Sequence, residues 1–329
     1  MSKDEMIINL STRPVLLLGD AIARLKEMPA GSVQTCVTSP PYWGLRDYGV
    51  DDQLGLEATP EEYVTNLVSV FREVRRVLRD DGTVWLNLGD SYAGSGKGQM
   101  KDGNHAPTSG SLQRTSKGTL TGGLPVDYKG LKPKDLVGIP WRVAFALQAD
   151  GWYLRSDIIW NKPNPMPESI LDRPTKSHEY IFLLAKNKRY YYDADAIKEA
   201  SMELGATKIR FGGNKYGDSD DVKHQTKSGN RYTDTGTRNV RSVWSITTNP
   251  YKDAHFATFP EELPERCIKA GTKPGDTVLD PFAGSGTTCA VAARLGRASI
   301  GIELNPEYLK LAQKRCWHGS KSLTEFNNE

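Results

Sequence analysis

The chain has 329 residues, of which 38% are hydrophobic, and its formal net charge is only +3. This length permits one large or two ordinary domains, and the hydrophobic fraction supports a globular core. The small net charge excludes a polycationic chain, so any nucleic-acid site must be a local basic patch.

Cysteine usage and the first residues narrow the class of protein further. Cys36, Cys267, Cys289 and Cys316 include no Cys-x-x-Cys pair, so we expect neither a metal site nor a disulfide framework. Reduced thiols favour a cytoplasmic protein. The charged N-terminus is not followed by an apolar run, so we expect no signal peptide and no membrane span.

The chain begins with a strand–helix–strand pattern. Residues 15–20 are predicted to form a buried strand that ends on Asp20, followed by a helix over residues 21–28. A second strand, residues 33–37, must stop at Ser39, because Pro40 and Pro41 cannot donate to a strand ladder.

Further helices and strands are predicted up to residue 192. Thr59-Pro60-Glu61-Glu62 is a capping box with proline at the first helical position, and apolar residues at helical spacing extend this helix to residues 80–82. We expect a strand over 83–88, a helix over 134–148, an antiparallel pair over 152–160 and 178–184, and a short β-like piece over 190–192. His178-Glu179 is interpreted as part of the strand pairing rather than as a general base.

Two polar segments interrupt these elements. Residues 91–134 hold nine glycines and carry seven basic and two acidic residues, a net charge of +5. Residues 201–242 carry eight basic and five acidic residues, a net charge of +3, with interspersed aromatic residues. Either segment alone is typical of a solvated loop, and phosphate contact is the functional alternative.

The stretch from Asp280 to Thr288 has the form of a ligand-binding turn. It follows a predicted strand over 276–279 and precedes a predicted helix over 289–295. Gly284 and Gly286 allow the backbone to approach a ligand, and the helix N-terminus favours an anionic or zwitterionic group. A strand over 298–302 leads to Glu303, placed as an acid that accepts hydrogen bonds from ribose hydroxyls.

This pattern favours a nucleoside-containing cofactor over other ligands. The third glycine of a dinucleotide fingerprint is missing, and no Gly-Lys-Ser/Thr follows as in a phosphate-binding P-loop. Only 49 residues follow Asp280, too few for a doubly wound sheet. We therefore expect the cofactor half last in the sequence and the other half of the sheet first.

Ser39-Pro40-Pro41-Tyr42 places a second group of functional side chains at a strand end. The Ser39 hydroxyl and the carbonyls of Ser39 and Pro40 are acceptors, and proline rigidity fixes their direction. Tyr42 adds a flat face, so the loop suits an exocyclic amine on a stacked base. On these residues alone, a proline-bounded strand end with a core tyrosine is the alternative.

These two motifs, in this order, resemble the β-class of S-adenosylmethionine-dependent DNA amino-methyltransferases, most closely the cytosine-N4-specific members. Gly19-Asp20, Trp160-Asn161-Lys162-Pro163 and residues 255–260 extend the resemblance. It implies an α/β fold, a doubly wound, mostly parallel, Rossmann-like sheet with permuted strand order and loop-rich DNA-recognition insertions. Residues 1–200 and 243–329 would form one catalytic domain, 91–134 a mobile basic loop, and 201–242 the target-recognition region.

The resemblance also implies site residues. The catalytic ones would be Ser39, Pro40, Pro41 and Tyr42. The cofactor-binding ones would be Asp20, Thr38, Phe256, Thr258, Asp280, Pro281, Phe282, Ala283, Gly284, Ser285, Gly286, Thr287 and Glu303. Candidate DNA-binding residues are Trp43, Arg46, Lys97, Arg114, Arg210, Lys215, Arg231 and Arg238.

The implied reaction is methyl transfer from S-adenosylmethionine, which becomes S-adenosylhomocysteine, to the amine of a flipped base. No Pro-Cys occurs in the chain, which excludes carbon-5 cytosine methylation. Serine at position 39 favours cytosine N4, with adenine N6 as the alternative and RNA or protein-glutamine methylation as more distant ones. An oxidoreductase and a non-catalytic DNA-binding protein fit less well. The partners would be double-stranded DNA and, as the resemblance allows, a second copy of the chain and a cognate restriction endonuclease. The resemblance implies a prokaryotic cytoplasmic enzyme, or one in the host cytoplasm if it is phage-encoded.

Overall fold

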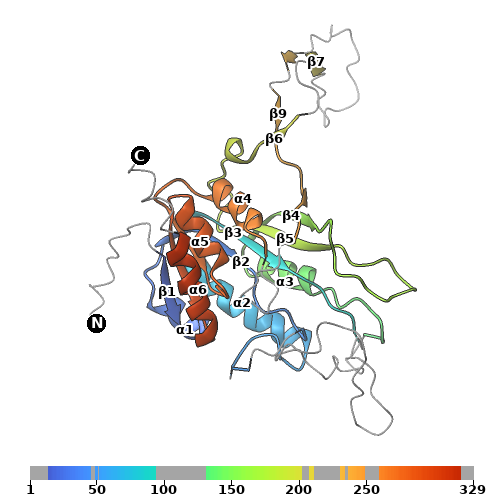
Figure 1. Cartoon of the computed structure of the whole chain (residues 1–329), viewed down its shortest axis with the longest axis vertical. Helices are drawn as coiled ribbons and strands as arrows, with labels where there is room; N and C mark the ends of the chain where they lie inside the picture. Colours follow the sequence, from blue (N-terminus) through green and yellow to red (C-terminus); the bar gives the residue numbers. More distant parts are fainter. Residues whose placement is uncertain are drawn as a thin grey trace, which may run out of the picture. The chain divides into compact units, whose positions relative to one another are not determined.

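The computed structural model describes residues 14–45, 49–50, 52–93, 131–201, 207–210, 230–233, 236–248 and 259–319. The chain divides into two compact units, Met1–Tyr192 with Ser242–Glu329 and Asp193–Arg241. The elements of the larger unit are, in chain order, β1 (Val15–Leu18), α1 (Ala21–Glu27), β2 (Val33–Thr38), α2 (Pro60–Val77), β3 (Leu78–Leu88), α3 (Ile139–Ala149), β4 (Tyr153–Asn161), β5 (His178–Ala185), β10 (Val243–Ser245), α4 (Glu262–Gly271), β11 (Thr277–Asp280), α5 (Thr287–Arg294), β12 (Ala298–Glu303) and α6 (Pro306–Gly319) (Figure 1).

A single sheet organises the larger unit. Among the described residues eight strands pair in the order β1-β12-β11-β2-β3-β5-β4-β10, and within this set β5 alone runs antiparallel to its neighbours. Helices α4, α5 and α6 pack on one face, and α1, α2 and α3 on the other (Figure 1). The last two strands of the chain lie between the first two, which confirms the predicted permuted, mostly parallel fold.

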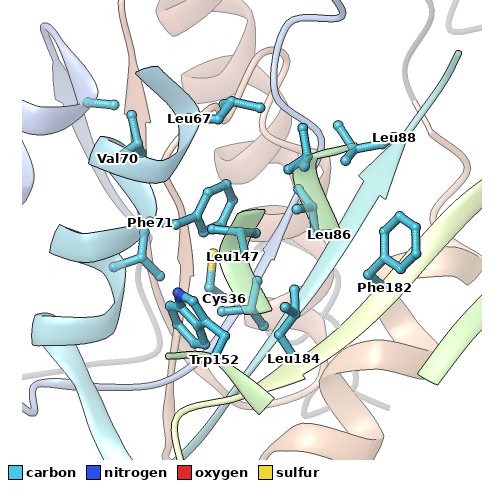
Figure 2. Close-up of a cluster of buried hydrophobic side chains, with 14 of the residues drawn as sticks. Cys36, Leu67, Val70, Phe71, Leu86, Leu88, Leu147, Trp152, Phe182 and Leu184 are labelled. Carbon is cyan, nitrogen blue, oxygen red and sulfur yellow. The ribbon is translucent and has the colours of Figure 1, made fainter. Parts of the chain in front are cut away.

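The core between the sheet and α2 follows from the helical spacing of apolar residues. Leu67 and Phe71 of α2 are fully buried against Leu86 of β3 and Leu147 of α3 (Figure 2). The helix begins as the capping box predicts, because the Thr59 hydroxyl accepts from the Glu62 N–H at 3.1 Å. This packing holds the carboxyl ends of β2 and β3 in place beneath the loops described below.

The predicted end of α2 is wrong by several residues. The helix stops at Val77, and Leu78 already pairs with Val33 as the first residue of β3. Gly82, predicted as the turn after the helix, lies inside β3 near a register shift between β2 and β3, where a Cβ would come within 2.9 Å of backbone oxygens. Strand pairing therefore overrides the helical pattern, and the glycine permits a bulge rather than a turn.

Three other predicted elements also differ. Helix α3 starts at Ile139 instead of residue 134, because Gly138 is left-handed (φ 77°) and Pro140 occupies the first turn. Strand β1 is a half-buried edge strand with Leu18 exposed, not a buried one. Residues 190–192 form no strand, and the ring of Tyr192 stacks on Trp85 instead.

The described residues of the smaller unit form two short antiparallel pairs. Its elements are η3 (Asp195–Ile197), β6 (Glu199–Ala200), β7 (Thr207–Arg210), β8 (Asn230–Thr233) and β9 (Thr237–Arg238). Strand β6 pairs with β9, and β7 pairs with β8. The Glu199 carboxylate accepts from Arg238 and Arg241 at 2.8 and 2.6 Å, which links the ends of this unit.

Candidate functional site

The two motifs singled out in the sequence lie at the ends of neighbouring parallel strands. Strand β2 runs into Ser39 and β11 ends on Asp280, and the two strands pair directly. The Thr38 hydroxyl donates to the Asp280 carboxylate at 2.7 Å, across 242 residues of sequence. The two motifs therefore form one site at the carboxyl edge of the sheet, where open α/β folds bind ligands.

Asp280 is an ionisable group almost without solvent contact. The residue is 2% exposed, and Oδ1 also accepts from the Phe282 N–H at 3.1 Å. Burial raises the pKa of Asp280 to about 6, although hydrogen bonds from Thr38, Thr288 and Phe282 act in the opposite direction. A buried carboxylate at the mouth of a turn suits a cationic ligand group such as an ammonium.

The turn that follows Asp280 contains two left-handed glycines in different surroundings. Gly284 is left-handed (φ 51°), and a Cβ built there would meet open space. Gly286 is also left-handed (φ 78°), and a Cβ there would come within 2.9 Å of Ala312, so α6 packs directly on the turn. Neighbouring Pro281, Ala283, Ser285 and Thr287 are buried, and Phe282 is half-buried. The turn therefore combines open space at Gly284 with a buried carboxylate at the end of β11.

Glu303 supports the glycine turn from the end of β12. Its two carboxylate oxygens accept from the Gly284 and Asn305 N–H groups, each at 2.8 Å. Burial raises the pKa of Glu303, and these backbone bonds oppose that shift. Asp20 lies at the neighbouring end of β1, where its carboxylate caps α1 by accepting from Ala23 N at 2.8 Å. The predicted contacts of these two acids with ribose and adenine stay predictions.

The Ser39–Tyr42 loop is fixed by its surroundings. Pro40 is buried, and the Pro41 carbonyl accepts from the Tyr63 hydroxyl at 2.7 Å. The Tyr42 ring packs against Gly89, where a Cβ would lie only 2.5 Å from Cε2. Ser39 is half-buried. The acceptors of this loop are therefore held in place before any ligand arrives.

The Tyr42 hydroxyl joins a polar network that the sequence analysis missed. Ser39 Oγ donates to Tyr42 Oη at 3.2 Å, and Tyr42 Oη lies 2.8 Å from Glu179 Oε2 and 3.1 Å from Asn87 Oδ1. Burial, and after it Glu179, raises the pKa of Tyr42. Glu179 was predicted to be part of a strand pair, which its backbone is. The sequence did carry one signal for Glu179: along β5 this charged residue shares a face with the apolar residues Ile181 and Leu183.

The candidate DNA contacts have mixed outcomes. Trp43 is 3% exposed and its indole N–H donates to Glu57 O at 2.9 Å, which favours packing over the predicted DNA contact. Arg238 is paired with Glu199, and Arg210 and Arg231 lie on β7 and β8. The remaining predicted site residues lie outside the described residues: Arg46, Lys97, Arg114, Lys215, Phe256 and Thr258.

The described ranges contain no group of three or more His, Cys, Asp or Glu side chains placed to hold a metal ion. Over those ranges, too, every helix is too short or too polar to cross a bilayer.

Comparisons with known proteins find similar sequences over most of the chain. Residues 33–314 match the family model described as DNA methylase. The chain is 49% identical over 300 residues to the Type II methyltransferase M.Cfr9I of Citrobacter freundii, covering 91% of this chain and 86% of the relative. It is 47% identical over 300 residues to the Type II methyltransferase M.SmaI of Serratia marcescens, covering 91% and 89%.

Two solved structures share the fold. PvuII DNA methyltransferase (cytosine-N4-specific) superimposes with a TM-score of 0.61 at 21% identity, covering 92% of this chain and 86% of the other. A putative DNA modification methylase from Thermus thermophilus, complexed with S-adenosyl-L-methionine, superimposes with a TM-score of 0.57 at 24% identity, covering 93% of each chain.

Proposed function

Because this chain belongs to the DNA methylase family, whose methyl donor is S-adenosylmethionine, we propose that it methylates the N4 amine of a flipped cytosine in double-stranded DNA. The observation that carries the proposal is the Thr38–Asp280 hydrogen bond, which joins the loop assigned to the base and the turn assigned to the donor. The preference for cytosine N4 over adenine N6 rests on serine at position 39.

We assign the cofactor to one side of the site from the charge of its carboxylates and the open space at Gly284. Asp280 would bind the ammonium of the methionine portion, the Gly284 turn would lie along that portion, and Glu303 and Asp20 would face ribose and adenine. When bound, S-adenosylmethionine supplies a methyl group on a positively charged sulfur. Phe256 and Thr258 would cover the methionine end.

The target side activates a weak nucleophile. The lone pair of a base amine is delocalised into the ring, so the amine attacks only when its N–H groups are held and that lone pair is localised. Ser39 Oγ and the Pro40 carbonyl would accept those N–H groups, and Tyr42 would stack on the extruded base. The loop is already rigid, so positioning and preorganised dipoles supply most of the acceleration.

Substrate binding is assigned to the basic segments. We place target recognition in residues 201–242 and backbone contact in residues 91–134, whose net charges are +3 and +5. The matched relatives are named Type II methyltransferases, and a cytoplasmic enzyme paired with a cognate endonuclease is part of the proposal. A homodimer is also part of the proposal.

The identity of the methylated atom tests the proposal. Purified enzyme is incubated with tritiated S-adenosylmethionine and duplex DNA, with RNA and protein in parallel, and the labelled nucleosides are identified by mass spectrometry. We expect label in DNA as N4-methylcytosine. N6-methyladenine as the sole product would contradict the base assignment, and label in RNA or protein alone would contradict the DNA assignment.

Cofactor affinity should depend on pH through Asp280. The pKa of this carboxyl is about 6, so it is ionised above pH 6 and protonated below. Protonation removes the partner of the cofactor ammonium, and the Kd measured by calorimetry should rise about tenfold from pH 7.5 to pH 5. Burial also raises the pKa of Glu303, so this carboxyl is a second candidate cause of the pH dependence. The Asp280→Asn variant is the control that separates the two. A pH slope that survives in Asp280→Asn would assign the effect to Glu303 instead.

A further inference from the structure

A continuous chain of hydrogen bonds leads away from the proposed base site. Ser39 Oγ donates to Tyr42 Oη at 3.2 Å, and Tyr42 Oη donates to Glu179 Oε2 at 2.8 Å. We propose that Glu179 is the final acceptor of a proton relay that runs from the target amine through Ser39 and Tyr42. The inference rests on the proposed function, because Ser39 must contact the amine.

The Glu179 carboxylate is held for this task by two residues. Asn87 Nδ2 donates to both Glu179 Oε2 and the Tyr180 carbonyl at 3.1 Å, which fixes the carboxylate beside the tyrosine. Lys162 forms an ion pair with the other oxygen, Oε1, and its Nζ lies 4.3 Å from the centre of the Trp160 ring. The side chains of Lys162 and Glu179 are only 20% and 16% exposed. The pair therefore supplies a charge-balanced carboxylate with one oxygen directed at Tyr42.

The proton balance of the reaction requires such an acceptor. When the amine nitrogen forms its bond to the methyl carbon, the S–CH₃ bond breaks and its electron pair stays on sulfur. Positive charge builds on the nitrogen as this bond forms, and the nitrogen loses a proton in the same step. That proton passes to Ser39 Oγ as the Ser39 proton passes to Tyr42 Oη and the Tyr42 proton to Glu179 Oε2. Glu179 ends neutral and releases the proton to solvent.

The direction of the relay agrees with the state of Tyr42. Burial raises the pKa of this hydroxyl, as does the neighbouring Glu179 charge, so Tyr42 stays a neutral phenol that can accept one proton only while giving up another. On the opposite side of the site, Asp280 Oδ1 already accepts from Thr38 and the Phe282 N–H. Glu179 is thus the carboxylate that the Ser39 hydroxyl reaches through a bonded partner.

Two variants and a control test the relay. Tyr42→Phe keeps the ring against Gly89 but breaks the path, and Glu179→Gln keeps an acceptor for Tyr42 but cannot take its proton. Glu265→Gln, which removes a carboxylate paired with Lys269 on α4, is the control. The readouts are the single-turnover rate and its solvent deuterium isotope effect, the KM for a duplex carrying the methylated site, and the Kd for S-adenosylmethionine.

We expect both relay variants to lower the single-turnover rate about 100-fold, as loss of general-base help does. Both should also lose the solvent isotope effect that the relay predicts for wild type. The KM for DNA, the cofactor Kd and the Glu265→Gln rate should stay at wild-type values.

A purely structural role would instead raise the KM and leave the isotope effect intact, which would overturn the relay. Should Glu179→Gln fail to fold, Tyr42→Phe decides by the same readouts. If the wild-type enzyme methylates DNA and the relay variants do so at an unchanged rate, only the relay is wrong. If the wild-type enzyme does not methylate DNA, the proposed function is wrong as well.

Discussion

Replacing Ser39 with alanine is expected to lower kcat by roughly 10²- to 10³-fold, the loss that follows removal of one preorganised hydrogen-bonding partner from a reacting group. The Ser39 hydroxyl is the acceptor placed to hold the target amine, and no other hydroxyl follows within the Pro40–Tyr42 loop except that of Tyr42, to which Ser39 donates. The effect should fall on kcat, because the cofactor contacts lie across the site at Asp280. Steady-state kinetics with tritiated S-adenosylmethionine, together with calorimetry for the cofactor Kd, measure both quantities.

A matched serine at the other end of the same strand provides the control. Ser32 precedes β2 and its hydroxyl donates to Pro29 O at 2.8 Å, so Ser32→Ala removes a comparable hydrogen bond far from the loop. Its kcat should equal that of wild type. If Ser39→Ala also retained the wild-type kcat, the assignment of the base to this loop would be wrong.

Replacing Asp280 with asparagine is expected to stabilise the protein and to abolish most cofactor binding. A pKa raised from 3.8 to about 6 means that the folded state disfavours the ionised form. The penalty is absent below pH 4, grows between pH 4 and 6, and is fully present above pH 6, where it reaches at most about 3 kcal/mol. Asparagine removes it, so the Tm at pH 7.5 without cofactor should rise by a few degrees. The cofactor Kd should rise by about 10- to 100-fold, because a charged hydrogen bond is lost.

An exposed aspartate on β4 separates this effect from a general change of charge. Asp157→Asn alters the net charge equally but lies at the surface of the sheet, so the Tm and the cofactor Kd should both stay at wild-type values. An Asp280→Asn variant that loses stability, or that binds S-adenosylmethionine as tightly as wild type, would contradict the role given to the buried carboxylate.

The meeting of the two motifs could be predicted because it depends on chain topology. Ser39 follows one buried strand and Asp280 ends another, and the carboxyl ends of parallel strands lie at one edge of a sheet. The short stretch after Asp280 required strands from the start of the chain. Strand β11 indeed lies between β12 and β2, so the sequence predicted both the permuted order and the neighbouring positions of the two loops.

The network behind Tyr42 could not be predicted in the same way. Glu179 lies 137 residues from Tyr42, and it reaches the site because β5 pairs antiparallel with β3 in a register that brings it close to Asn87. Pairing registers of distant strands are set by the packing of the whole sheet rather than by local pattern. The same reason explains the end of α2, where pairing of Leu78 with Val33 overcame a helical pattern.

A crystal structure of the protein with S-adenosylhomocysteine and a duplex carrying its site tests most directly whether one pocket holds both donor and base. We expect an extruded cytosine stacked on Tyr42, with its amine about 3 Å from Ser39 Oγ and the Pro40 carbonyl, and the cofactor ammonium beside Asp280. A target base that stays within the duplex, or that is bound away from the Ser39–Tyr42 loop while the cofactor lies against Asp280, would contradict the account.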